Sequence, residues 1–324
     1  MWVAGWGHPA VQVEGASPDP PAVGVSRDGG KTWVSVCWPD GWPPNGAGRA
    51  VAFRSSLGFI VGSFYDRTFV LRTADAGTTW QTVTLPDAAQ PSGGANCGQA
   101  DAAIIDDHNV WLVAAGGIYH SGDAGRSFTR QAVPNDGPCA FGRLAFADAA
   151  HVWATGSNRV VRTADGGTTW TDSNQPLPVP AYAALNDVFF TDAAHGFIAT
   201  SDSVDNTPRG LLFATDDGGQ TWRKALETPG ILRSVDFVDH DHGFVAGGTP
   251  ARGEVWATID GGQTWERRAA LDSRDIQVIS FIDRERGYGT ISNRPCIIAT
   301  TDGGHTWTKI PVAGPTPHPC EPDG

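Results

Sequence analysis

The sequence has few of the residues that several functional classes require. It contains one methionine, four tyrosines and five cysteines, and its 23 lysines and arginines are outnumbered by 35 aspartates and glutamates. A nucleic-acid surface needs clustered Lys and Arg to displace counterions. The net charge of −12 and the lack of a basic run therefore argue against nucleic acid and against an anionic membrane surface as partners. No stretch reaches the roughly eighteen apolar residues of a membrane span.

The start of the chain also lacks a secretory signal. Residues 1–10 have neither a basic start nor an apolar segment. Residues 2–6, Trp-Val-Ala-Gly-Trp, instead have the composition of a β-strand. We therefore expect that a signal and some upstream residues are absent from this sequence.

Glycine, proline and tryptophan are abundant, with 41, 23 and 13 copies, and 40% of the residues are hydrophobic. This composition indicates a folded chain with many turns. The pattern Ser/Thr-x-Asp-x-Gly-x-Thr-Trp recurs seven times, and its third copy is degenerate, with Ser127 and Phe128 at the end. The seven aspartates are Asp28, Asp75, Asp123, Asp165, Asp217, Asp260 and Asp302. They are 47, 48, 42, 52, 43 and 42 residues apart, which is the sequence signature of a repeat architecture.

The chemistry of the motif indicates a structural turn. The Asp carboxylate can accept hydrogen bonds from the backbone N–H groups of its own turn, and Gly supplies a positive φ. The Trp that follows is expected to wedge between sheets as an apolar anchor. The alternative, a calcium loop, is disfavoured because the alternating Asp/Asn ligands and the distal Glu of an EF-hand are missing.

Each motif follows three short apolar strands and leads into a fourth. Residues 188–200 and 235–247 each read as a strand, a tight turn and a second strand, and Gly210–Thr215 reads as a third. Four antiparallel strands in about 45 residues form one propeller blade. We therefore predict an all-β fold in which residues 1–324 form a single seven-bladed β-propeller, with almost no helix.

Blade 1 is predicted to be incomplete. Residues 2–6 align with the second strand of later blades, so the innermost strand is missing upstream. Propellers often close by borrowing a strand from the other terminus. The Pro-rich tail, residues 311–324, is a poor substitute because its prolines remove the donors that a central strand needs.

The motif resembles the Asp-box, or bacterial neuraminidase, repeat over essentially the whole chain. The run His-Gly-Phe-x-x-Gly followed by Thr-x-Asp-Gly-Gly-x-Thr-Trp is most similar to the photosystem II stability/assembly factor family. The resemblance implies a seven-bladed propeller and an arginine-lined binding patch. It specifies function weakly, because function lies in loops grafted onto the fold.

The other Asp-box families include sialidases and xyloglucanase-type glycoside hydrolases. The Phe/Tyr-Arg-Ile-Pro motif of sialidases is absent, and the nearest string is Phe53-Arg54-Ser55-Ser56. The four tyrosines have no evident Glu partner, and xyloglucanases resemble two propellers that clasp a cleft with paired carboxylates. His151, His195 and His242 occupy one repeat position in turns of different blades, so we interpret them as structural and too far apart to share a metal.

Two sets of residues are not explained by the repeat pattern, and both are predicted to lie on the face opposite the Asp-boxes. Trp6, Trp38 and Trp42 form either an aromatic platform for a sugar or peptide or a plug for blade 1. Four arginines lie at the starts of innermost strands, where they could hold a carboxylate or an acidic segment. They are Arg49, Arg143, Arg233 and Arg274. The alternative, solvated rim charges, is favoured by the residues alone.

The cysteines lie in loops and lack metal-ligand spacing such as Cys-x-x-Cys. Loop cysteines suit disulfides and an oxidising compartment. We expect the pairs Cys97–Cys139 and Cys296–Cys320, with Cys37 unpaired; each bridge requires a Cα separation of about 4.4–6.8 Å.

The sequence therefore favours a non-enzymatic binding or assembly scaffold, monomeric and extracytoplasmic in a bacterium, that contacts a protein or glycan without a metal or cofactor. The runner-up is a divergent glycoside hydrolase or lyase. A paired-carboxylate cleft in the structure would favour the runner-up, whereas a shallow face of arginine and aromatic side chains would favour the scaffold.

Overall fold

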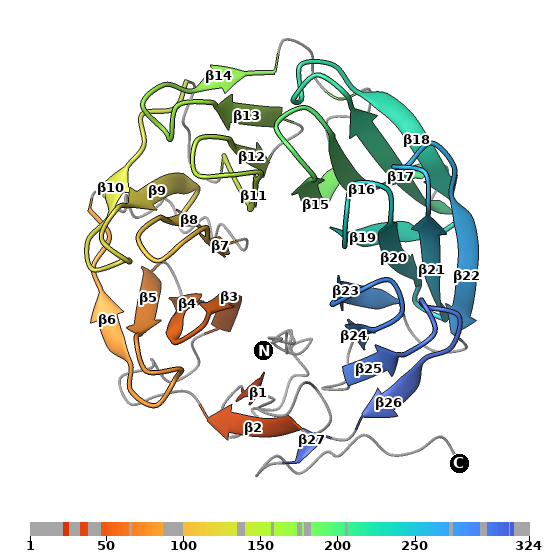
Figure 1. The fold of residues 1–324 in the computed structure, drawn as a ribbon, viewed down its shortest axis with the longest axis horizontal. Helices are drawn as coiled ribbons and strands as arrows, with labels where there is room; N and C mark the ends of the chain where they lie inside the picture. The colour runs from red at the N-terminus through yellow and green to blue at the C-terminus, as the bar shows by residue number, and fades with distance from the viewer. Residues whose placement is uncertain are drawn as a thin grey trace. The chain divides into compact units, whose positions relative to one another are not determined.

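A computed structural model describes residues 22–25, 33–37, 47–64, 67–86, 100–134, 140–156, 159–173, 177, 183–204, 207–271, 275–291, 297–310 and 312–313. These residues form strands and turns, with six four-stranded antiparallel sheets and one three-stranded sheet (Figure 1). The described part of the chain has no helix that could cross a membrane. The prediction of an all-β chain of four-stranded repeats is thus confirmed for six repeats. Closure into a seven-bladed ring stays a prediction.

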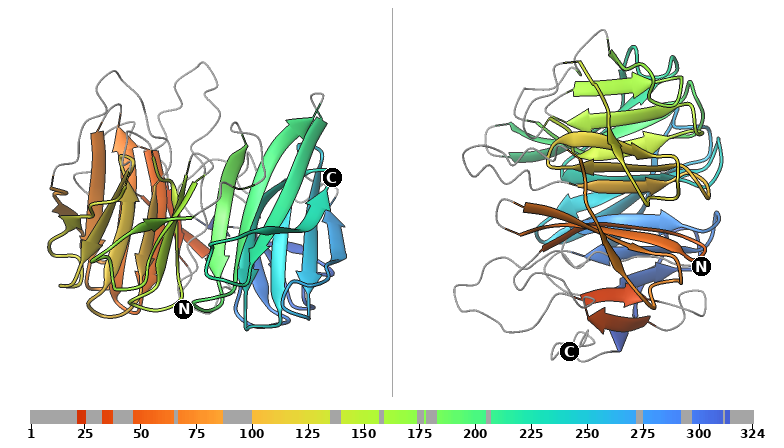
Figure 2. Two further views of the ribbon diagram at one scale, coloured as in Figure 1. Left: turned by 90° about the horizontal axis from the view of Figure 1, so that it is seen from above. Right: turned by 90° about the vertical axis from the view of Figure 1, so that its left-hand side faces the viewer.

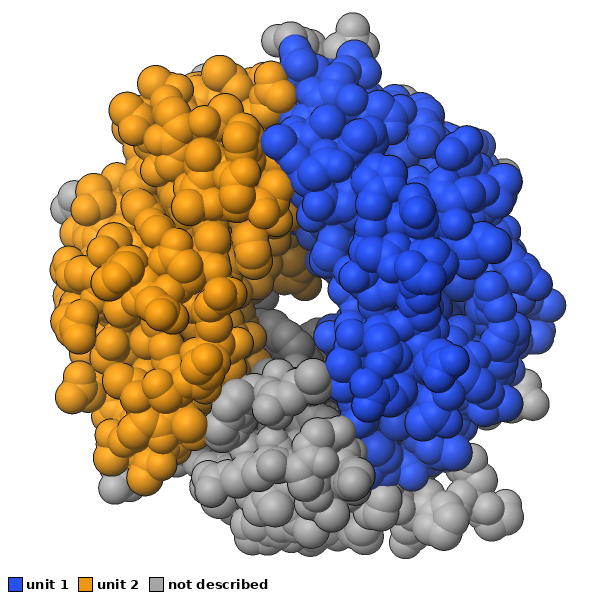
Figure 3. All heavy atoms as spheres, in the orientation of Figure 1, with its two compact units in different colours: residues 1, 3–36, 177–324 blue, residues 2, 37–176 orange. Residues whose placement is uncertain are grey.

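The chain divides into two compact units, and the single predicted domain stays a prediction (Figure 3). Unit 2, residues 2 and 37–176, contains blades 2, 3 and 4, numbered by their place in the repeat. Blade 2 consists of β3 (Ala47–Arg54), β4 (Leu57–Phe64), β5 (Arg67–Thr73) and β6 (Gln81–Val83). Blade 3 consists of β7 (Asp101–Ile104), β8 (Val110–Ala114), β9 (Gly117–Ser121) and β10 (Thr129–Arg130). Blade 4 consists of β11 (Arg143–Phe146), β12 (Val152–Gly156), β13 (Arg159–Thr163) and β14 (Thr171–Asp172).

Unit 1, residues 1, 3–36 and 177–324, contains blades 5, 6 and 7 and the three-stranded sheet. Blade 5 consists of β15 (Ala184–Phe190), β16 (Gly196–Val204), β17 (Thr207–Thr215) and β18 (Arg223–Thr228). Blade 6 consists of β19 (Ile231–Phe237), β20 (Gly243–Thr249), β21 (Arg252–Thr258) and β22 (Glu266–Leu271). Blade 7 consists of β23 (Ile276–Phe281), β24 (Gly287–Ile291), β25 (Ile297–Thr300) and β26 (Thr308–Ile310). The strands of each blade follow chain order across the sheet, and Figure 2 shows the sheets from two further sides.

The three-stranded sheet contains the described part of blade 1. Its order is β1 (Ala22–Val25), β2 (Trp33–Cys37) and β27 (Val312–Ala313). β27 pairs with β2 in parallel, with Val312 opposite Trp33. Two residues of the Pro-rich tail therefore add a strand beside the last strand of the blade, a contribution that the sequence analysis did not include. Residues 1–21 lie outside the described residues.

The Asp-box turn is closed by its own side chains, as blade 6 shows. Thr264 donates its backbone N–H to Oδ1 of Asp260 at 2.9 Å and its hydroxyl to Oδ2 at 2.6 Å. The hydroxyl of Thr258 donates to the same carboxylate and accepts the N–H of Gly262. These bonds, led by the hydroxyl of Thr264, lower the pKa of Asp260 to about 2. The predicted carboxylate–backbone bonding is therefore confirmed here.

The same bonds recur in the other five described blades, at Asp75, Asp123, Asp165, Asp217 and Asp302. The degenerate third copy keeps them, because Ser127 supplies both the N–H and the hydroxyl that Thr supplies elsewhere. Asp28 of the first copy lies outside the described residues.

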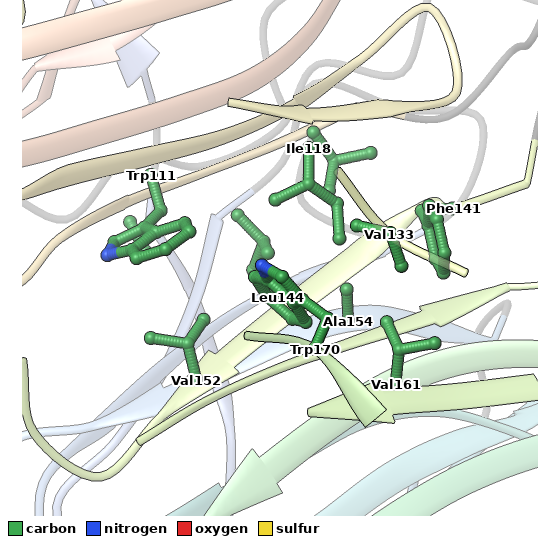
Figure 4. Close-up of a cluster of buried hydrophobic side chains, with 11 residues drawn as sticks. Trp111, Ile118, Val133, Phe141, Leu144, Val152, Ala154, Val161 and Trp170 are labelled. Carbon is green, nitrogen blue, oxygen red and sulfur yellow. The ribbon is translucent and has the colours of Figure 1, made fainter. Parts of the chain in front are cut away.

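In three of the described Asp-boxes, the aromatic residue packs against the preceding blade. Trp170 of blade 4 meets Trp111 of β8 edge-on, with ring centroids 5.8 Å apart (Figure 4). Phe128 of blade 3 meets Phe59 of β4 in the same way, and Trp265 of blade 6 meets a Phe of β16. Trp111 and Trp170 belong to one buried cluster with apolar residues of both blades. The predicted wedge between sheets is confirmed at these contacts.

The second glycine of the Asp-box is required both by its backbone conformation and by the space around it. Gly262 has φ +79°, and a Cβ there would lie 2.5 Å from a ring carbon of Phe197 in the preceding blade. Gly125 and Gly167 meet the aromatic rings of Phe59 and Trp111 in the same way. The glycine thus allows both the left-handed turn and the close approach of the neighbouring ring.

Side-chain oxygens of one innermost strand accept backbone N–H groups of the next. Oδ2 of Asp101 accepts the N–H of Leu144 at 2.9 Å, and Oδ2 of Asp187 accepts that of Val235 at 2.9 Å. At the equivalent position in blade 6, the hydroxyl of Ser234 accepts a backbone N–H of β23. Because unpaired buried N–H groups are costly, these acceptors hold adjacent blades in register.

Replacing Gly262 by Ala tests the close packing between blades 5 and 6. We expect Gly262→Ala to destabilise the protein by about 1–3 kcal/mol more than Gly261→Ala, because only the former meets Phe197. Gly261 is the matched control: its φ is +68°, but Ala76 and Ala124 already occupy that box position in blades 2 and 3. Equal free energies of unfolding in urea would contradict this account.

The buried carboxyl of Asp236 should make stability depend on pH. Burial raises its pKa to about 7, despite the hydrogen bond from the N–H of Phe281, and the charge of Asp187 adds to the rise. The folded state therefore holds this proton more tightly than the unfolded chain. Its contribution is complete below about pH 4 and is lost as the pH rises through 7, by at most about 4 kcal/mol.

Urea unfolding of wild type and Asp236→Asn between pH 4 and pH 8 checks this expectation. The amide oxygen of Asn can still accept the N–H of Phe281 but cannot titrate. The variant should lose the decline in unfolding free energy over this interval. A variant that keeps the wild-type slope would show that Asp236 is not its source.

Candidate functional site

A β-bulge places a polar residue at the same point of four innermost strands. The pairing of β15 with β16 skips Asn186, that of β19 with β20 skips Arg233, and that of β23 with β24 skips Gln277. In blade 2 the skipped residue is Arg49. Bulges re-aim a side chain and are enriched next to functional sites. Two of the four predicted arginines thus occupy one structural position.

Arg233 is anchored across the boundary between blades 6 and 7. Its Nε donates to Oδ2 of Asp275 at 2.9 Å, and Nε2 of Gln277 donates to the same oxygen at 2.8 Å. The Asp275 side chain is 7% exposed, whereas that of Arg233 is 33% exposed. The ion pair uses Nε, so the partly exposed guanidinium keeps its terminal nitrogens for further hydrogen bonds. Arg233 is therefore held in place by Asp275 and can still bind a ligand through its terminal nitrogens.

This end of blade 6 lies opposite its Asp-box. Ile231, at the start of β19, pairs with Gly248 near the end of β20, and β21 begins beyond the turn that follows. The Asp-box begins at the far end of β21, with Thr258. The predicted placement of Arg233 on the face opposite the Asp-boxes is thus supported by the register of its own blade.

Arg143 in unit 2 starts β11 and lies beside a buried carboxyl. Its Nη1 donates to the carbonyl oxygen of Gly142 at 3.2 Å. Burial raises the pKa of Asp101, and the guanidinium of Arg143 opposes that rise. The charge of Arg143 therefore stabilises the ionised carboxyl of Asp101. Arg143 also lies at the start of an innermost strand, as predicted.

A second anchored arginine lies at the same end of blade 5. Arg209 of β17 binds Asp202 of β16 through two bonds, Nε to Oδ1 at 3.0 Å and Nη2 to Oδ2 at 2.6 Å. The Asp202 side chain is fully buried, and this hydrogen bonding raises the pKa of Arg209. Glu227 lies 3.6 Å from Nη1 of Arg209. Sequence reasoning missed this group, although the 52-residue interval between Asp165 and Asp217 marks the longer hairpin that carries it.

Several predicted residues lie wholly or partly outside the described part of the chain. Trp6, Trp38, Trp42, Arg274 and the cysteines Cys97, Cys139, Cys296 and Cys320 lie outside the described residues. For Arg49 and Cys37 only the backbone is described, within β3 and β2. The aromatic platform, the fourth arginine and both disulfides therefore stay predictions.

The three repeat-position histidines each contact an aspartate of their own turn. Nδ1 of His151, His195 and His242 lies 2.8 to 3.0 Å from a carboxylate oxygen three residues earlier. Asp239, the partner of His242, also binds Arg284 of the blade 7 turn. These contacts support the structural interpretation of the three histidines.

A hollow of about 440 Å³ lies on the Asp-box side of blades 6 and 7, lined by Val238, Asp239, Ile282, Asp283, Arg284 and Glu285. Two of its carboxyls are strongly acidic. His242 and Arg284 help hold the pKa of Asp239 well below its usual range, and Arg286 lowers the pKa of Asp283 to about 2. A glycosidase acid needs a raised pKa, so Asp239 and Asp283 are poorly suited to that role.

Comparisons with known proteins show what the chain is similar to. The family model of the photosynthesis system II assembly factor YCF48 matches residues 223–323. This part of the chain is therefore similar to that family. A curated relative, the photosystem II assembly lipoprotein Ycf48 of Synechococcus sp. (strain CC9902), is 35% identical over 82 residues. The matched segment spans 25% of this chain and only 22% of that protein.

Solved structures share the fold over most of the chain. YCF48 bound to D1 peptide has a TM-score of 0.58 at 17% identity, covering 87% of this chain and 84% of that chain. The GH74 xyloglucanase from Xanthomonas campestris has a TM-score of 0.57 at 18% identity, covering 81% and 45%. The selenomethionine-substituted virginiamycin B lyase from Staphylococcus aureus has a TM-score of 0.59 at 12% identity, covering 82% and 87%. At such identities the likeness shows the fold alone.

Proposed function

We propose that this chain is a non-enzymatic scaffold that binds an acidic segment of a partner protein through the blade ends opposite the Asp-boxes. The bulged, anchored guanidinium of Arg233 carries the proposal. Its ion pair with the buried Asp275 fixes its position, so little side-chain entropy is lost when a carboxylate binds. Planar guanidinium groups recognise carboxylates through paired hydrogen bonds.

The comparisons support a protein partner over a glycan. The family model describes an assembly factor, and one structural neighbour is bound to a peptide. The glycoside hydrolase neighbour shares the fold, but the match covers only 45% of that enzyme's chain. This is consistent with the expectation that one propeller supplies half of a two-propeller cleft. The carboxyl of Asp236, whose pKa is raised, accepts a backbone N–H, so it is badly placed for acid catalysis.

The architecture and compartment belong to the same proposal. Seven Asp-box copies, six four-stranded blades and the sheet formed by β1, β2 and β27 support a single seven-bladed propeller. The loop positions of the cysteines support an extracytoplasmic location in a bacterium, where the predicted bridges could form. We propose a monomer, because the scaffold needs only its own blades to position Arg233.

Fluorescence anisotropy with synthetic peptides tests the binding proposal. An Asp/Glu-rich peptide with a free C-terminal carboxylate should bind more tightly than a Lys-rich peptide of equal length. Arg233→Ala should weaken the affinity for the acidic peptide about tenfold or more, because the substitution removes a charge-assisted hydrogen bond. The matched control is Arg223→Ala on the outer strand β18, where the side chain is 45% exposed and makes only a long ion pair with Asp216.

Two results would contradict the proposal. Equal affinity for acidic and basic peptides, or equal losses in the two variants, would show that the inner-strand arginine does not select the ligand. Cleavage of a xyloglucan oligosaccharide by the wild-type protein would favour the glycoside hydrolase alternative instead.

A further inference from the structure

The hairpin turn between the first two strands of a blade contains a preformed Asp–His pair. In blade 5, Oδ1 of Asp192 accepts the backbone N–H groups of Ala194 and His195, which fixes the carboxylate. Nδ1 of His195 then lies 2.9 Å from Oδ2 of Asp192. The turn thus holds one imidazole and one carboxylate side by side.

The residue that follows the turn aspartate reaches back toward the preceding blade. In blade 7 this residue is Arg284, whose Nη2 lies 2.8 Å from Oδ2 of Asp239 in blade 6. In blade 6 it is His240, whose ring centroid lies 5.1 Å from that of His195 in blade 5. The repeat therefore delivers a second imidazole to the Asp192–His195 pair.

The three side chains form one compact group. One ligand atom from each of Asp192, His195 and His240 lies within 4.8 Å of the other two. Nδ1 of His240 lies 3.0 Å from Oδ1 of Asp241, so this imidazole also has its own carboxylate. The side chains of Asp192, His195 and His240 are 44%, 41% and 60% exposed, so an ion can enter and the rings can adjust.

The donor types of the three side chains indicate the class of ion. Two imidazoles and one carboxylate are the donors preferred by zinc and by its neighbours nickel and copper, whereas calcium and magnesium prefer oxygen ligands.

We propose that Asp192, His195 and His240 form a binding site for a divalent transition-metal ion of the zinc class. The three ligands leave a fourth coordination position open toward solvent, as in zinc sites that bind water or an exogenous ligand. The site lies on the Asp-box side of blades 5 and 6. It is therefore separate from the arginine site and does not depend on the proposed function.

The histidine that joins His195 is not the one that the repeat alignment indicates. The sequence interpretation considered His151, His195 and His242, which share one repeat position. The structure instead brings His195 together with His240, a residue that the repeat alignment places elsewhere in its turn. Histidines in turns of adjacent blades can therefore lie within reach of one ion.

Isothermal titration of the tag-free protein with Zn²⁺ tests the site. We expect one ion per chain, with no comparable binding of Ca²⁺. Asp192→Asn and His240→Ala should each weaken Zn²⁺ binding by at least tenfold, since even outer-shell partners contribute about 10–100-fold. His151→Ala is the matched control, because it removes the same type of Asp–His pair in blade 4 and should leave the affinity unchanged. Circular dichroism confirms that each variant is folded.

A gain of binding provides an independent test. The blade 6 turn already holds the Asp239–His242 pair at 2.8 Å, and Arg284 occupies the place that His240 takes one blade earlier. Arg284→His should therefore add a second Zn²⁺ equivalent. The proposal is overturned if wild type binds no Zn²⁺, if His240→Ala binds as tightly as wild type, or if His151→Ala loses as much affinity as His240→Ala.

Discussion

Each unit depends on oxygen atoms that accept a backbone N–H from the adjacent blade. Asp101, Asp187 and Ser234 occupy the same repeat position, and each receives the N–H of the residue one step further along the next innermost strand. Inner strands of different blades do not share a sheet, so ladder bonds cannot set their relative height. A short polar side chain at one position does so, and the bulges, turns and apolar contacts are aligned as a result.

The two ends of a blade perform different tasks because their side chains come from different parts of the repeat. At the Asp-box end, the carboxylate is saturated by its own turn, and the aromatic residue and glycine fit the preceding blade. At the other end, bulges present polar side chains such as Arg233 without disturbing the apolar strand that follows. Function can therefore vary at the bulges while the fold is maintained elsewhere, which is consistent with one fold serving assembly factors, hydrolases and lyases.

Much of the fold could be predicted from the sequence because the repeat is local. The spacing of Asp217 and Asp260 and the apolar runs between them predict four strands and one closed turn without reference to distant residues. The placement of Arg233 followed from the same alignment. Its partner Asp275 did not, because an ion pair between blades depends on a bulge that periodicity does not indicate.

The His195–His240 contact and the strand at Val312 were missed for a related reason. Both contacts join segments from different blades, and a pattern search within one repeat cannot find them. Asp202 and Arg209 were also missed, because a longer hairpin departs from the repeat instead of following it. Sequence reasoning therefore worked best where one repeat determines the structure and least well where two blades meet.

Amide hydrogen exchange at Val235 tests the role of the inner-strand acceptors most directly. In Asp187→Ala the N–H of Val235 loses its acceptor, so its exchange should accelerate on the order of tenfold or more. The N–H of Leu144, held by Asp101, should exchange as in wild type, and Asp187→Asn, which keeps an acceptor oxygen, should protect Val235 better than Asp187→Ala. Unchanged exchange at Val235, or equal acceleration at Val235 and Leu144, would contradict the claim that these oxygens hold neighbouring blades together.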